Sequence, residues 1–195
     1  MNKYISIFFC VQIIALNLFA MQPKVTPVDY VRPQIDTHKS RWFFFSSASR
    51  PFGMVSLSPD TWTEGSWNSG YLYNSKEIRC FSHVHCWQLA GVPVMPTTGE
   101  VKGHKGMDAY KSTYSHETEI VKPGYHKVEL DTYQIRVELT STSRVGMHRY
   151  TYPAGEKANV LFDVGALLAH GKTEKAAIHR ISSKEIGGYS VLSPT

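Results

Sequence analysis

The feature that most restricts the fold of this chain is a succession of short segments in which apolar and polar residues alternate. Residues 125–130 and 135–140 show it most clearly, and His126, Val128 and Leu130 share one face of the first segment. This is the pattern of a half-buried strand. Residues 145–152 and 160–164 are two more such segments, and weaker ones follow at residues 178–181 and 189–192. Short strands with a turn every ~8–12 residues predict an all-β antiparallel sandwich or a barrel.

The remaining segments are consistent with this class. Tyr30–Val31 is expected to be a short first strand, residues 41–46 (RWFFFS) have strand length, and residues 53–57 are expected to be extended. The one helical candidate is short and covers residues 173–180.

Composition supports a folded globular protein. The 195 residues correspond to one domain, with 42% hydrophobic and 19% charged residues. The net charge is +5, and lysines and arginines are scattered along the chain, which favours a solvated surface over a nucleic-acid partner.

Residues 1–20 differ from the rest. They carry one lysine near the start, an apolar centre and Phe19–Ala20 before Met21, which is the pattern of a secretory signal peptide. The alternative is a buried first element. A signal peptide predicts cleavage after Ala20, a secreted or periplasmic protein, and no membrane span in the mature chain.

Residues 50–99 concentrate the side chains suited to binding, with three of the four tryptophans and two histidines separated by one residue. Trp67 is a candidate platform for the apolar face of a sugar, although core packing of the ring is a close alternative. His83 and His85 would lie on one face of a strand and are candidate sugar ligands. Structural hydrogen bonding is the alternative for both histidines.

The two cysteines in this stretch, Cys80 and Cys86, allow a further alternative. Thiolate and imidazole ligands suit zinc, so a metal site with the two histidines remains open. In an extended segment the cysteine α-carbons would lie about 20 Å apart, which predicts two free thiols.

Several short blocks follow one another along the chain: RPFGMVSLSPDT, SGYLY, CFSHVH, MPTTG and YSHETEIVKPGYHKVEL, and then IRVELTSTSRVGMHRYTYP. In this order they resemble the amino-terminal domain of glycoside hydrolase family 92, the exo-acting α-mannosidases. The chain departs from the family at Cys80, where glycine is usual, and in CWQLAGVP, which replaces a glycine-rich segment.

The resemblance implies a supersandwich-type β-domain over residues 21–195, incomplete at its carboxyl end, in a calcium-dependent inverting enzyme. It also implies that the acid, the base and the calcium ligands come mainly from a carboxy-terminal catalytic domain absent here. No catalytic or metal residue is therefore assigned, Asp60 is expected to cap a turn, and the chain alone is expected to be inactive. Its partners would be a mannose-containing glycan and the catalytic domain. The alternative is a free-standing carbohydrate-binding β-domain without activity.

Overall fold

A computed structural model describes residues 25–38, 48–64, 70–85, 89–166 and 172–193. The chain divides into two compact units, residues 1–31 and 32–195. The described part of the first unit contains the 3₁₀-helix η1 (Pro27–Tyr30). The strand expected at Tyr30–Val31 is therefore wrong. Pro27 opens the helical turn, and the Asp29 carboxylate accepts a 2.7 Å hydrogen bond from the Thr26 backbone N–H, which favours the turn.

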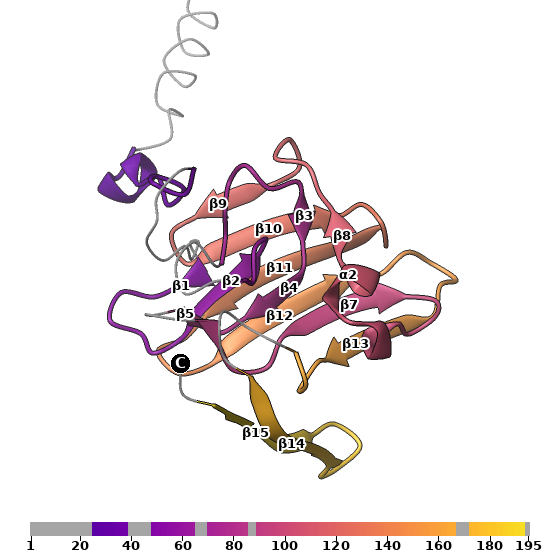
Figure 1. Ribbon diagram of the computed structural model, residues 1–195. Helices are drawn as coiled ribbons and strands as arrows, with labels where there is room; N and C mark the ends of the chain where they lie inside the picture. Colours follow the sequence, from indigo (N-terminus) through magenta and orange to yellow (C-terminus); the bar gives the residue numbers. More distant parts are fainter. Residues whose placement is uncertain (1–24, 39–47, 65–69, 86–88, 167–171, 194–195) are drawn as a thin grey trace, which may run out of the picture. The chain divides into compact units, whose positions relative to one another are not determined.

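The second unit is built from antiparallel strands in two main sheets (Figure 1). The larger sheet contains, in spatial order, β1 (Ala48–Ser49), β2 (Ser56–Asp60), β4 (Cys80–Ser82), β7 (Val94–Thr98) and β13 (Ala158–Phe162). The other contains β12 (Gly146–Thr151), β11 (Ile135–Ser141), β10 (Tyr125–Leu130) and β9 (Ile120–Lys122).

Three two-stranded ladders and two helical turns complete the described elements. The ladders pair β3 (Glu77–Ile78) with β8 (Ser112–Thr113), β5 (Val84–His85) with β6 (Leu89–Ala90), and β14 (Thr173–Arg180) with β15 (Ile186–Leu192). The turns are η2 (Gly103–Lys105) and α2 (Met107–Tyr110).

The core lies between the two main sheets. Leu57 and Phe81 from the larger sheet pack in one buried cluster with Val128, Ile135 and Val137 from the other. Both sheets thus bury one face against each other, which is the arrangement of a β-sandwich. The predicted all-β antiparallel sandwich is confirmed.

The hairpin of β10 and β11 shows why these residues form strands. His126, Val128 and Leu130 of β10 are buried and alternate with side chains that are half-buried, as predicted. Leu130 pairs with Ile135 across the sheet. Each fully buried aliphatic side chain contributes about 1.5–3 kcal/mol to stability, so the alternation fixes which face is inward.

A second segment contradicts its expected secondary structure. Residues 173–180 were the helical candidate but form strand β14, paired along its length with β15. Strand pairing with a neighbouring segment outweighs the weak helical preference of a short sequence. The expected strand at residues 41–46 lies outside the described residues.

No helix in the described part of the chain has the length and apolar character needed to cross a membrane.

Candidate functional site

The two candidate histidines follow β4 where the chain bends. His83 occupies the bend between β4 and β5, and His85 is in β5. The bend gives the two imidazoles different surroundings: His85 is 3% exposed, whereas His83 is partly exposed and lies against β12.

His85 belongs to a buried polar group with Asp60 of β2. Its Nε2 lies 2.6 Å from Asp60 Oδ1 and 3.3 Å from Ser82 Oγ. Its Nδ1 donates a 2.6 Å hydrogen bond to the Ser56 carbonyl oxygen. Both ring nitrogens are thus bonded within the fold, and the role of His85 as a sugar ligand stays a prediction.

Asp60 does not cap a turn, and that expectation is wrong. The residue ends β2, is 0% exposed, and bonds His85 through one carboxylate oxygen. The other oxygen accepts a 3.4 Å hydrogen bond from the Cys80 thiol. A carboxylate buried in the core needs a hydrogen-bonding or charged partner, and His85 provides it. The sequence does not show that the strand of His85 lies next to β2.

Cys80 is a free, buried thiol, as predicted. Burial, followed by the negative charge of Asp60, raises the pKa of this thiol well above its usual value, so it stays protonated and unreactive. Cys86 lies outside the described residues.

His83 contacts His148 of β12, and His148 in turn contacts Tyr150 of the same strand. Its Nε2 lies 2.9 Å from Nε2 of His148, and Nδ1 of His148 lies 2.8 Å from the Tyr150 hydroxyl. Burial, and then the charge of His83, lower the pKa of His148 to about 4. Burial, followed by the charge of His85, also lowers the pKa of His83. Both rings are therefore neutral at neutral pH.

The low pKa of His148 predicts acid sensitivity. A histidine whose pKa is lowered by folding contributes stability above its unfolded value of 6.5, and that stability is lost as pH falls toward 4. The free energy of unfolding should fall by about 2 kcal/mol between pH ~7 and pH ~5, with His83 adding to the loss. Urea unfolding at the two pH values measures it.

The matched variants are His148→Gln, which should reduce this slope, and His179→Gln, which should not because His179 is exposed on β14. Equal slopes in both variants would show that His148 is not the cause.

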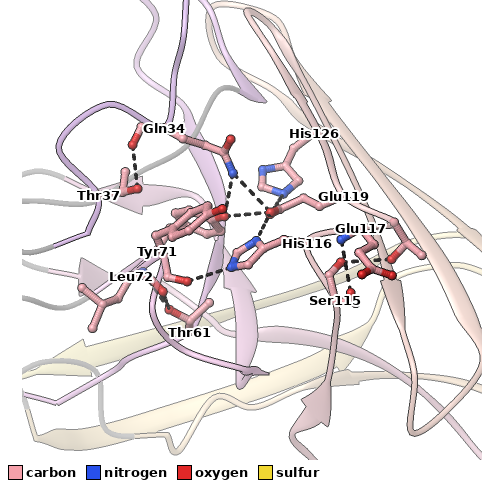
Figure 2. Close-up of polar contacts among 12 residues, drawn as sticks. Gln34, Thr37, Thr61, Tyr71, Leu72, Ser115, His116, Glu117, Glu119 and His126 are labelled. Atoms are coloured by element: carbon pink, nitrogen blue, oxygen red, sulfur yellow. Dashed lines mark hydrogen bonds and ion pairs between the residues drawn. The ribbon is translucent and has the colours of Figure 1, made fainter.

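A second polar cluster surrounds Glu119, whose side chain is 2% exposed (Figure 2). The carboxylate accepts hydrogen bonds from four donors in different segments. They are Gln34 Nε2 at 3.2 Å, Tyr71 Oη at 2.9 Å, His116 Nδ1 at 2.6 Å and His126 Nε2 at 2.8 Å. His116 also donates through Nε2 to the Tyr73 carbonyl oxygen and stacks on the Tyr73 ring at 4.0 Å.

These contacts hold Glu119 ionised. Burial opposes ionisation, but the hydrogen bond and charge of His126 and the hydrogen bonds of His116 and Tyr71 outweigh it, so the pKa lies below its usual value. No face of the carboxylate is open to a ligand, so its role is to join four segments of the fold. One sequence signal could have indicated it: His126 shares a buried face with Val128 and Leu130, and a buried imidazole needs a polar partner.

Trp67 lies outside the described residues, but the base of its loop is defined. Trp62 and Gly70 form an antiparallel bridge, with backbone N–H···O distances of 3.0 and 2.7 Å. The flanking residues Trp62 and Gly70 therefore lie side by side.

A metal site would draw on the acidic, imidazole and thiol side chains of this region. In the described ranges, no three or more histidine, cysteine, aspartate or glutamate side chains converge as metal ligands would. Asp60 and Glu119 are bonded to histidines, whereas calcium requires six to eight oxygen ligands. Asp60 and Glu119 thus do not fit a calcium site.

Comparison with known proteins identifies the family. Residues 30–195 match the model of the glycosyl hydrolase family 92 N-terminal domain. The chain belongs to glycoside hydrolase family 92, as its amino-terminal domain. A search of curated proteins gave no significant match.

Three solved structures resemble this family 92 domain. A GH92 α-mannosidase from Bacteroides thetaiotaomicron is 34% identical, with a TM-score of 0.76 over 85% of this chain and 24% of its own. Its complex with mannoimidazole gives 33% identity, a TM-score of 0.75, and coverage of 85% and 23%. A GH92 inverting mannosidase from strain VPI-5482 of the same species shares the fold at 22% identity and a TM-score of 0.67, over 86% of this chain and 22% of its own. The family 92 domain thus spans about a quarter of the length of these proteins.

Proposed function

We propose that this domain forms the substrate-covering part of a secreted, calcium-dependent, inverting α-mannosidase and does not hydrolyse α-mannosides by itself. The observation that carries the proposal is the likeness, at 34% identity, to a GH92 α-mannosidase. The mannoimidazole complex of that enzyme supports a mannose-containing glycan as the ligand class.

The carboxylates support the lack of independent activity. Inverting hydrolysis needs an acid and a base about 6.5–9.5 Å apart with room for water between them. Asp60 and Glu119, the buried carboxylates described above, have oxygens occupied by histidine, tyrosine or thiol donors. We therefore assign the acid, the base and the calcium ligands to a separate catalytic domain.

Exposed apolar side chains on β13, β14 and β15 support a partner of this kind. An open hollow of about 170 Å³ lies among them, lined by Phe162, Ile178, Ile186 and Tyr189. These four side chains are 39–57% exposed. Exposed apolar patches mark interaction sites, and we assign this one to the catalytic domain. The surface favours that assignment over a free-standing carbohydrate-binding domain, which would leave it in water.

In the sugar site we place Trp67 as a stacking platform and His83 as a hydrogen-bond donor, with His85 behind it. Inverting hydrolysis needs a pair of carboxyl groups, which these three side chains do not supply, so we assign them to binding. The affinity for a single mannose unit should be weak, near 1 mM, which corresponds to about 4 kcal/mol.

A titration of the purified domain with methyl α-mannopyranoside, followed by NMR, tests this proposal. We expect saturable shifts near His83, and a roughly threefold to tenfold weaker affinity in Trp67→Ala, since one aromatic contact contributes ~0.5–1.5 kcal/mol. Tyr189→Ala, which removes an exposed aromatic ring of β15, serves as the control and should bind normally. Equal affinity of wild type and Trp67→Ala would remove Trp67 from the site, and an absence of any shift would refute sugar binding.

A further inference from the structure

Tyr150, His148 and His83 form a row of three hydrogen-bonded side chains, two on β12 and the last at the bend after β4. His148 and Tyr150 occupy alternate positions of β12 and therefore share one face of the strand. The Tyr150 hydroxyl lies 2.8 Å from His148 Nδ1, and His148 Nε2 lies 2.9 Å from His83 Nε2. Phe81 packs edge-on against the His148 ring, with centroids 6.3 Å apart at 89°, and this contact fixes the ring plane.

The position of His83 depends on the absence of a side chain at Gly146. A Cβ at this position would lie 2.8 Å from His83 Nε2, closer than van der Waals contact permits. Gly146 thus lets the imidazole lie against the backbone of β12. The His83 ring thus packs closely on Gly146 and bonds His148 of the same strand.

The available hydrogen-bond partners indicate where the protons of Tyr150 and His148 lie. Among the described residues, the only hydrogen-bond partner of the Tyr150 hydroxyl is His148 Nδ1. A hydroxyl proton in this half-buried position needs an acceptor, so Tyr150 donates to Nδ1 of a neutral His148. The His148 proton is then on Nε2, which donates to His83 Nε2.

The hydrogen bond from His148 then determines the tautomer of His83. Because its Nε2 accepts from His148, the single proton of the neutral ring is on Nδ1. Nδ1 has no hydrogen-bond partner within the described ranges. The reverse arrangement, with His83 donating, would leave the Tyr150 proton without a protein acceptor among the described residues. Two protonated rings are excluded because like charges at 2.9 Å repel.

We propose that His148 and Tyr150 are positioning residues that hold His83 in the Nδ1–H tautomer, so that Nδ1–H donates to a hydroxyl oxygen of a bound mannose-type sugar. The sugar contact rests on the proposed function, whereas the tautomer does not. A fixed donor is suited to a sugar hydroxyl because that oxygen has two acceptor lone pairs.

NMR of the full chain with ¹⁵N-labelled histidine tests the tautomer, because protonated and unprotonated ring nitrogens differ widely in ¹⁵N shift. Wild-type His83 should show the proton on Nδ1. In Tyr150→Phe the ring stays but the hydroxyl donor is lost, so the Nδ1–H to Nε2–H ratio at His83 should fall by roughly threefold to tenfold, the equivalent of one hydrogen bond.

Tyr152→Phe is the matched control. It removes one tyrosine hydrogen bond from the same end of β12, the 2.6 Å bond from Tyr152 Oη to the Asn159 carbonyl oxygen, and should leave the His83 ratio unchanged. An Nε2–H tautomer in the wild type, or equal ratios in the two variants, would overturn the positioning role.

Addition of methyl α-mannopyranoside to the same samples tests the sugar contact separately. The His83 Nδ1 signal should move on binding, and Tyr150→Phe should bind about threefold more weakly than Tyr152→Phe. If the tautomer is as proposed but the His83 signal does not move at saturating sugar, the sugar contact is refuted and the positioning role stands.

Discussion

Glu119→Gln is expected to destabilise the domain by about 3–5 kcal/mol, the usual result of breaking a buried charged network by removing one partner. The glutamine keeps the shape of the side chain but removes the charge that pairs with His116 and His126. The NH₂ of its amide group would also face N–H and O–H groups that now donate to the carboxylate. Because small domains are stable by only about 5–15 kcal/mol, a large part of the total would be lost.

Urea unfolding of the purified variants measures this loss. Glu117→Gln is the matched control, because it is two residues away, exposed, and makes the same chemical change. We expect Glu117→Gln to change stability by no more than about 0.5 kcal/mol. A loss below ~1 kcal/mol in Glu119→Gln would show that the network joins these segments without stabilising them.

Asp60→Asn should cost a similar amount, about 3 kcal/mol. The carboxylate is fully buried and bonds both the His85 ring at 2.6 Å and the Cys80 thiol. An amide in its place leaves His85 without its charged partner in the core, which is the costly half of a buried pair.

A double-mutant cycle with His85→Gln isolates the pair. The double variant should be less destabilised than the sum of the single variants, with a coupling of about 1–3 kcal/mol. Asp131→Asn, at an exposed position, is the control and should be close to neutral. Additive losses would mean that Asp60 and His85 stabilise the fold independently.

The regular part of the fold was predictable because its information is local. In β10 and β11 the alternation alone identifies the buried face, and Pro123–Gly124 provides the turn before β10, with Gly124 at a φ of 76°. The segment that became β14 was misassigned because its structure depends on pairing with β15, which no local pattern encodes.

The site was less predictable because its contacts join distant parts of the chain. The sequence indicated His83 and His85 but not their partners, since Asp60 precedes His85 by 25 positions and His148 follows His83 by 65. His83 lies at a bend and packs against Gly146, a contact between residues 63 positions apart that no local pattern shows.

We propose that this family 92 domain binds a mannose-type sugar but does not itself break the glycosidic bond. An assay of mannose release from an α-mannoside by the purified chain, with and without added calcium, distinguishes these two properties from hydrolysis. We expect no release under either condition, in samples whose far-UV circular dichroism shows a folded β protein. Calcium-dependent release of mannose by this chain alone would contradict it and would place the catalytic carboxylates within these 195 residues.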